Sequence, residues 1–293
     1  MRVRTGANEL KTIGMISDRV RWDEKALIQA AKKKGVKLVV IDGKSIFLEA
    51  TGDFDNIPEA DIYLQRMVST FKGLYVTKIL ESKGYPVVNS YAVSSVCADK
   101  LLTTLALRKA GIPCPRTFVA FDIAAALNTL DELRYPAVIK PVFGSWGRLV
   151  APLKDPQSAK AILESRESMG ALYQIYYIQE LVEKVSNRDI RSFIIGDKVV
   201  TAIYRIAGQG EWRTNTALGG RAEVCPVTPE IEEISLKAAK AIGEGVFGVD
   251  ILETEKGMLV NEVNHTMEYH TTVPLTGVDI PSMIIDYCLE IVK

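Results

Sequence analysis

The most constraining feature of this sequence is a predicted β-hairpin near its C-terminus. Two apolar segments, residues 246–252 and 260–264, flank Thr254–Gly257, a polar turn that ends in glycine. Folding the chain about Lys256 sets Asp250 opposite Glu262 on the neighbouring strand. The hairpin is therefore expected to bring two carboxylates together.

The polar side chains of this hairpin form a candidate metal site. Side chains alternate between the two faces of a strand, so Glu262 and Asn264 should share one face. Asn261 and Val263 should share the other. Oxygen ligands hold Mg²⁺ against nucleotide phosphates, which makes Asp250, Glu262 and Asn264 candidate ligands. The alternative is a solvated hairpin face with two acids and an amide.

The first 95 residues alternate strand and helix patterns. Strands are predicted at Thr12–Ile16 and Val36–Ile41. Asp23 can cap the helix between them, and Gly35 can end it. The order recurs up to Asn89, which predicts a small parallel α/β sheet. No Gly-x-Gly-x-x-Gly motif follows the first strand, so a dinucleotide-binding fold has little support.

Arginines follow the strands of this segment. Arg19, Arg21 and Arg66 sit at the expected carboxyl ends of strands, where open α/β sheets bind ligands. They are candidate contacts for an anionic partner, and the alternative is that they are solvated loop arginines.

Composition limits the kinds of partner. Lys+Arg and Asp+Glu balance at 36 each, which gives no indication of a nucleic-acid or membrane partner. The four cysteines are scattered without paired spacing, as expected for reduced thiols. No apolar run reaches the length of a membrane span. We therefore expect a soluble, cytoplasmic protein.

The middle of the chain carries residue types that contact nucleotides. Lys140 ends a predicted strand and precedes Gly144–Gly147, a small-residue turn whose N–H groups could approach phosphate oxygens. Lys100 could add a second cation, or it is an ordinary helix-surface lysine. The strand Ile178–Val182 has the apolar–polar–acid–apolar pattern found where adenine packs, although any strand could show it.

Arginines on predicted strands form a third group. Arg191 and Arg205 alternate with apolar residues, and an inward-facing arginine must meet an anion. Guanidinium groups bind carboxylates and phosphoryl groups bidentately. Together with Arg213 they are candidate phosphoryl contacts, and the alternative is structural ion pairing with acids such as Asp250.

Zinc is a further possibility because the two histidines, His265 and His270, lie beside Glu268. Their spacing matches no helical zinc motif, and the neighbouring oxygen ligands favour magnesium.

Taken in order, these motifs resemble those of the RimK-like ATP-grasp ligases, and most closely the LysX group. The resemblance covers essentially the whole chain. It is most specific at Gly144-Ser-Trp-Gly-Arg148, Trp212-Arg-Thr-Asn215, Asn261-Glu-Val-Asn-His-Thr-Met-Glu268 and Thr276–Pro281.

The resemblance implies an α/β chain with the ATP-grasp fold, in which two lobes clasp ATP. Three domains are expected. Residues 1–95 would form an N-terminal parallel α/β domain, residues 96–178 a central lobe with the glycine-rich phosphate loop, and residues 179–293 a C-terminal lobe with the Mg²⁺ site.

The resemblance also implies roles for individual residues. ATP would be bound by Lys100, Lys140, Gly144, Ser145, Trp146, Gly147, Gln179, Glu180, Leu181, Val182 and Asp189. Two Mg²⁺ ions would be held by Asp250, Glu262 and Asn264. The implied catalytic residues are Arg191, Arg205, Arg213 and Asn215. The carrier would be received by Arg19, Arg21 and Arg66, and the amino acid by His265, Thr266 and Glu268.

In the LysX group, ATP activates the C-terminal glutamate of the acidic carrier protein LysW as an acylphosphate, which the amino group of 2-aminoadipate attacks. The resemblance implies this step of lysine biosynthesis, catalysed by a homodimer or homotetramer. After Met267-Glu268 the group has an aromatic residue, a basic residue and Asn, whereas this chain has Tyr269-His270-Thr271. Glutamate, as in the arginine branch, or both amino acids remain alternatives, and a non-catalytic nucleotide-binding scaffold is a more distant one. Met1–Leu10 have no counterpart in the group.

Overall fold

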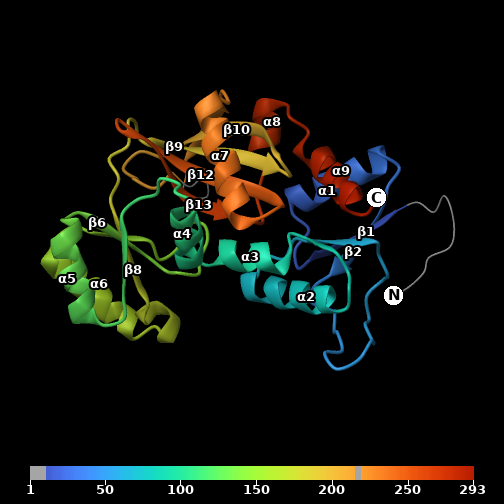
Figure 1. The fold of residues 1–293 in the computed structure, drawn as a ribbon, viewed down its shortest axis with the longest axis horizontal. Helices are drawn as coiled ribbons and strands as arrows, with labels where there is room; N and C mark the ends of the chain where they lie inside the picture. Colours follow the sequence, from blue (N-terminus) through green and yellow to red (C-terminus); the bar gives the residue numbers. More distant parts are fainter. Residues whose placement is uncertain (1–10, 215–218) are drawn as a thin grey trace. The chain divides into compact units, whose positions relative to one another are not determined.

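The computed structural model describes residues 11–214 and 219–293, so Met1–Leu10 and the predicted catalytic residue Asn215 lie outside the described residues. The chain divides into two compact units (Figure 1). The first combines Met1–Ser94 with Thr266–Lys293, and the second is Ser95–His265.

The first unit is built on a parallel sheet with strand order β2-β1-β3-β4, which confirms the predicted parallel pairing. Its core includes Ile16, Tyr63 and Leu80. Gly14 lets β1 approach Tyr63 closely, because a Cβ there would lie 2.7 Å from the tyrosine ring. The elements are β1 Thr12–Ser17, α1 Trp22–Lys33, β2 Lys37–Asp42, β3 Ile62–Gln65, α2 Thr70–Ser82 and β4 Val87–Val88.

The last segment of the chain returns to this first unit. Helices α8 (Thr272–Thr276) and α9 (Ile280–Ile291) follow the hairpin of residues 246–264, and α9 lies beside α1 (Figure 1). The sequence pattern predicts a last helix near Ile280–Ile291, and the structure confirms it. However, residues 266–293 pack with the N-terminal unit, whereas they were expected in the C-terminal lobe. The apolar face of α9, which includes the fully buried Ile280 and Ile285, drives this packing.

The second unit contains two antiparallel sheets. The smaller has strand order β5-β8-β6-β7, and helices α5 and α6 pack against it around Leu130, Leu163 and Tyr176. Asp155 caps α6 by accepting a hydrogen bond from the Ser158 N–H. The elements are β5 Thr117–Ala120, α5 Ile123–Leu133, β6 Ala137–Lys140, β7 Ala151–Leu153, α6 Pro156–Glu167, the 3₁₀ helix η1 Ala171–Gln174 and β8 Tyr176–Glu180.

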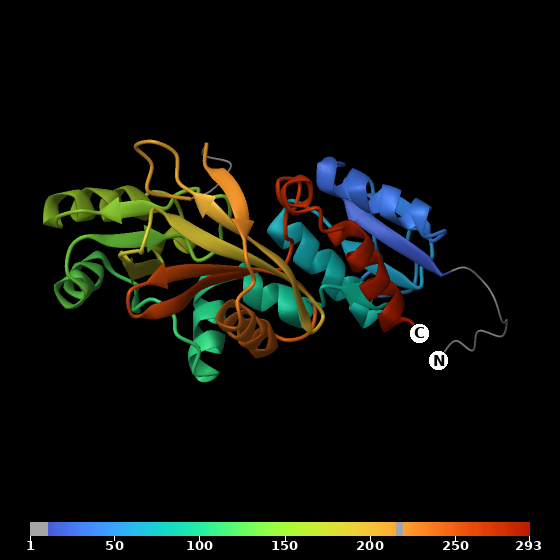
Figure 2. The ribbon, with the colours of Figure 1, turned by 90° about the horizontal axis from the view of Figure 1, so that it is seen from above.

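The larger sheet has strand order β11-β10-β9-β12-β13, and α7 lies along one of its faces (Figure 2). Helix α7 spans Pro229–Ile242, as the sequence pattern predicts, with Thr228 as its cap. The strands are β9 Arg188–Ile195, β10 Lys198–Ile206, β11 Arg221–Cys225, β12 Val246–Thr254 and β13 Gly257–Asn264.

Two helices complete the part of the chain that the structure describes. Helix α3 (Tyr91–Ala98) crosses the boundary between the units, and α4 (Lys100–Lys109) begins after Asp99, whose carboxylate accepts from the Leu101 and Leu102 N–H groups. Across the described ranges, every helix is too short or too polar to cross a membrane.

Candidate active site

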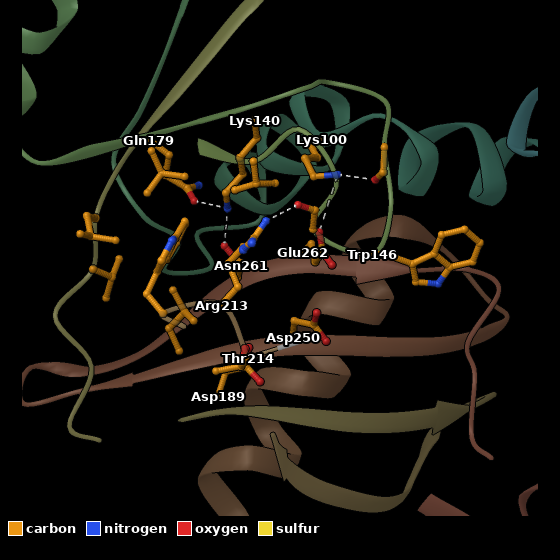
Figure 3. A pocket seen from close by; sticks show the side chains of 18 of the residues that line it. Lys100, Lys140, Trp146, Gln179, Asp189, Arg213, Thr214, Asp250, Asn261 and Glu262 are labelled. Atoms are coloured by element: carbon orange, nitrogen blue, oxygen red, sulfur yellow. Dashed lines mark hydrogen bonds and ion pairs between the residues drawn. The ribbon is translucent and has the colours of Figure 1, made fainter. Parts of the chain in front are cut away.

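A pocket in the second unit collects most of the predicted nucleotide and metal residues (Figure 3). Its walls come from β6, β8 and the glycine-rich loop of the smaller sheet and from β9, β10, β12 and β13 of the larger one. The predicted residues that line it are Lys100, Lys140, Gly144, Ser145, Trp146, Gly147, Gln179, Glu180, Leu181, Val182, Asp189, Arg205, Arg213, Asp250 and Glu262.

The β12–β13 hairpin pairs Asp250 with Glu262, as predicted. A β-bulge lies beside this pair, because Ile251 pairs with Val260 and the chain then skips Asn261 before Glu262. Asn261 and Glu262 both line the pocket. The prediction that Asn261 points to the opposite face from Glu262 is therefore wrong, because strict alternation fails at a bulge.

Lys140 stands at the end of β6 and reaches across to the hairpin (Figure 3). Its Nζ donates to Oε1 of Gln179 at 2.6 Å and to Oδ1 of Asn261 at 2.9 Å. Burial lowers the pKa of Lys140 to about 8, a shift that the carboxylate of Glu262 opposes. The Lys140 ammonium group therefore loses its proton more easily than an ordinary lysine, at a place where an anionic ligand could bind.

Lys100 links the glycine-rich loop to the hairpin. Its Nζ donates to the carbonyl oxygen of Gly144 at 2.7 Å and lies 3.8 Å from Oε2 of Glu262. The loop has left-handed backbone at Trp146, Gly147 and Leu149. Such turns orient successive N–H groups to one side, which is the backbone geometry of anion-binding concavities.

Arginines and acids form a continuous, largely buried network at the wall of the pocket. Arg191 binds both carboxylate oxygens of Asp250, at 2.7 and 2.8 Å. Arg205 binds both oxygens of Asp189, at 2.7 and 2.8 Å, and also contacts Asp250 at 2.8 Å. Thr214 donates its hydroxyl to Asp189. The predicted alternative of ion pairing is therefore realised for both strand arginines.

Burial alone would raise the pKa of Asp250, but Arg191 and Arg205 outweigh burial and hold that pKa far below its ordinary value. Burial likewise disfavours the charge on Arg205, yet Asp250 and Asp189 raise its pKa. These residues therefore stay ionised, and Asp250 keeps its negative charge in the pocket.

Arg213 contacts the glycine-rich loop from the other lobe. Its Nε and one Nη bind the carboxylate of Glu211 at 3.0 and 2.7 Å, and its other Nη donates to the Gly147 carbonyl at 3.1 Å. The same Glu211 carboxylate accepts from two backbone N–H groups, those of Trp212 and Arg213, at 3.0 Å each. Glu211 thus holds the arginine in place.

The end of β8 and the residues that follow it, Gln179–Val182, form one wall of the pocket. Glu180 already accepts a hydrogen bond from the Arg116 N–H at 2.7 Å, so its carboxylate is partly engaged. Leu181 is 39% exposed at the pocket edge.

Lys184 also lines the pocket and was missed in the sequence, where it looks like any surface lysine. Trp212, Thr214 and Asn261 were likewise missed, although each lies within a motif that the sequence singles out.

The predicted carrier residues lie in the first unit. Arg19 is exposed after β1. Arg21 pairs with Glu24 at 3.1 Å and with Glu268. Arg66 is 4% exposed, pairs with Glu24 at 3.0 Å and donates to the Met267 carbonyl at 3.0 Å. Two of the three arginines are thus occupied by acids of the chain itself.

The predicted amino-acid residues lie on either side of the point in the sequence where the second unit ends. His265 ends the second unit and Thr266 begins the last segment of the first. Tyr269 is fully buried, and both its N–H and its hydroxyl donate to Asp23, at 2.6 and 3.1 Å. Asp23 was expected as a helix cap, but it lies inside the first turn of α1 and binds this segment instead.

The candidate metal ligands fit a hard cation by their chemistry. Asp250 and Glu262 present carboxylates from paired strands, and the amide of Asn264 lies 3.3 Å from Oε1 of Glu262. Within the described ranges, no group of three His, Cys, Asp or Glu side chains could hold a metal. The zinc alternative at His265, Glu268 and His270 therefore gains no support, and an oxygen site needs the asparagine or other oxygen ligands.

Two family models together match nearly the whole chain. The RimK-like ATP-grasp domain matches residues 97–288, and the LysX preATP-grasp domain matches residues 13–96. The chain belongs to the RimK-like ATP-grasp family. It is an ATP-grasp carboxylate–amine ligase, and the predicted fold is confirmed. Enzymes of this family use ATP and Mg²⁺.

Named relatives align over almost their whole length. A Saccharolobus solfataricus protein named alpha-aminoadipate–LysW ligase LysX is 40% identical over 93% of this chain and 99% of its own. A Sulfolobus acidocaldarius protein named glutamate–LysW ligase ArgX is 32% identical over 94% of this chain and 97% of its own. The crystal structure of a RimK domain ATP-grasp protein from Sphaerobacter thermophilus has a TM-score of 0.81 at 25% identity, covering 95% of this chain and 99% of its own.

Proposed function

We propose that this ligase joins the C-terminal glutamate of an acidic carrier protein, LysW, to the amino group of 2-aminoadipate. The observation that carries the proposal is a difference in identity among relatives. Three proteins named for this reaction are 37–40% identical to the chain. Two proteins named for the same reaction with glutamate are 32–33% identical.

In this proposal the pocket of the second unit binds ATP. Lys100, Lys140 and the loop Gly144–Gly147 bind the phosphates, since they bring two ammonium groups and a left-handed backbone turn to one place. Gln179–Val182 and Asp189 border the adenosine.

Asp250, Glu262 and Asn264 are the proposed ligands for two Mg²⁺ ions. Bound there, the metal would neutralise phosphate charge during transfer. Asp250 suits this role because its arginine partners keep it ionised.

The arginines divide by their contacts. Arg191 and Arg205 are bound to acids and would hold Asp189 and Asp250 in place. Arg213 lies against the phosphate loop and is the proposed contact for the transferring phosphoryl group and the acylphosphate that it forms. Asn215, which lies outside the described residues, is proposed as a further catalytic residue.

The carrier and amino-acid contacts are proposed on other residues. Arg19, Arg21 and Arg66 would attract the acidic carrier tail, and Arg19 is the most exposed of the three. His265, Thr266 and Glu268 would contact the amino acid. We propose a cytoplasmic homodimer or homotetramer without nucleic-acid or membrane partners. Residues 1–95, 96–178 and 179–293 are its proposed functional domains, and residues 266–293 of the last domain pack with the N-terminal unit.

The deciding experiment measures ADP release with ATP, Mg²⁺, purified carrier and either 2-aminoadipate or glutamate. A strong preference for 2-aminoadipate supports the proposal. A preference for glutamate assigns the arginine branch, and equal rates indicate a dual enzyme. No release with either amino acid would overturn the proposal.

A further inference from the structure

Three cationic side chains bind the carbonyl oxygens of the glycine-rich loop. Lys100 binds Gly144 and Arg213 binds Gly147, at 2.7 and 3.1 Å. Arg166 donates to the carbonyl of Leu149. The three cations come from different elements, α4, the segment before Asn215, and α6. Because the carbonyl oxygens of the loop are held in this way, its N–H groups can point toward the phosphates of ATP.

Arg166 differs from the other two cations in its surroundings. It is 5% exposed and follows Ala159 and Leu163 on the buried face of α6. Within the described ranges no carboxylate forms an ion pair with it, and burial lowers its pKa. Placing a cation in a core position is costly unless a polar partner compensates. The Leu149 carbonyl is that partner.

Leu149 is itself in a conformation that needs support. Its φ is 57°, in the left-handed region that residues with a side chain rarely adopt. Trp146 and Gly147, with φ of 56° and 66°, share this region. Such backbone persists only when neighbouring groups hold it.

We propose that Arg166 is a positioning residue for the phosphate loop, holding the Leu149 carbonyl so that the left-handed turn stays formed for ATP. The inference rests on the proposed nucleotide role of the loop. Arg166 does not line the pocket, whereas Lys100 and Arg213 do. Phosphate oxygens compete for the donors of Lys100 and Arg213, so the bond from Arg166 is the one that persists when ATP binds.

The test compares Arg166→Met and Arg166→Lys with the wild-type enzyme. The matched control is Lys160→Met, which removes a 64%-exposed cation from the same helix. Binding of a non-hydrolysable ATP analogue is measured by calorimetry, and kcat and KM by ADP release. Amide hydrogen exchange is followed separately in peptides from the loop and from β5, β6 and β8.

Losing a hydrogen bond from a charged donor should weaken analogue binding about tenfold to a hundredfold in Arg166→Met. KM for ATP rises more than kcat falls. Exchange accelerates in residues 144–150 but not in the sheet, Arg166→Lys recovers part of the loss, and the control matches wild type. Unchanged ATP affinity would overturn the inference. So would faster exchange throughout the lobe, because that pattern describes general destabilisation.

The exchange comparison needs no nucleotide. If the wild-type enzyme bound no ATP, the proposed function would fail, while loop exchange in Arg166→Met would still decide whether Arg166 holds the loop.

Discussion

Asp250 and Glu262 face each other across β12 and β13 because a β-bulge inserts Asn261 into the second strand. Between the turn and Ile251 the strands pair in a register that would set Asp250 opposite Asn261. The extra residue shifts the register by one and pairs the two carboxylates instead. It also turns Asn261 toward Lys140. The candidate metal site and a lysine contact therefore depend on one irregular residue.

Replacing Glu262 with alanine should abolish most catalysis and leave the fold intact. The side chain is half-buried at the pocket wall and is not part of the hydrophobic core, so its removal creates no core cavity. We expect ADP release to fall at least about a hundredfold with little change in melting temperature. Glu255→Gln, in the exposed hairpin turn, is the control. Undiminished turnover would show that the metal assignment is wrong.

Arg213→Ala should lower kcat much more than it weakens ATP binding. The guanidinium contacts the loop and is held in place by Glu211. Its proposed role is to stabilise the phosphoryl group during transfer, and binding of ATP itself depends on it less. We expect about a hundredfold lower kcat with a small change in the ATP dissociation constant. Arg221→Ala removes a 73%-exposed arginine from β11 and should have no effect. A kcat of Arg213→Ala equal to that of the wild-type enzyme would show that Arg213 takes no part in the chemical step.

The catalytic efficiency, kcat/KM for ATP, should decline as pH rises past the pKa of Lys140. Burial lowers that pKa to about 8, so the amine is charged below this pH and neutral above it. A neutral amine cannot pair with phosphate, and kcat/KM reports ionisation of the free enzyme. We therefore expect kcat/KM for ATP to fall above about pH 8. In Lys140→Arg, which stays charged, this decline should disappear. Its persistence would assign the decline to another group.

Arg19→Glu should weaken binding of the carrier without affecting binding of ATP. Arg19 is exposed at the carboxyl end of β1, where a negative charge would repel an acidic tail. We expect KM for the carrier to rise, and the difference from wild type to shrink as salt is added. Lys37→Glu makes the same charge change at the opposite end of the parallel sheet and serves as control. Carrier binding that is insensitive to salt would argue against electrostatic capture.

Arg66→Met should destabilise the enzyme because it removes the more buried of the two arginines that pair with the Glu24 carboxylate. Glu24 is fully buried and pairs with Arg66 at 3.0 Å. Removing one member of a buried pair costs about 3–5 kcal/mol. Arg21→Met, which removes a more exposed partner of the same carboxylate, should cost less. Denaturant unfolding measures both. If Arg66→Met were as stable as the wild-type enzyme, Arg66 would have no structural role and could serve to bind the carrier.

The strongest sequence predictions concern local patterns. The bounds of α7 and α9 follow from their caps, prolines and apolar spacing, and the parallel order of the first sheet follows from alternating strands and helices. Lys140 could be placed at a strand end before a small-residue turn, because both features are read within a few residues. Residue type also identifies hard oxygen ligands wherever they occur.

Relations between distant residues were decided by the tertiary structure. Arg191 and Arg205 could have faced phosphate or acid, and only packing of β9, β10 and β12 placed them on Asp250 and Asp189. The sequence treats Arg166 as one more helix charge, and folding buries it against Leu149. The sequence by itself determined the elements, the family and the residue types of the site, since these depend on local spacing and order. The partners of each charge and the register at the bulge depend on long-range packing, which no local pattern encodes.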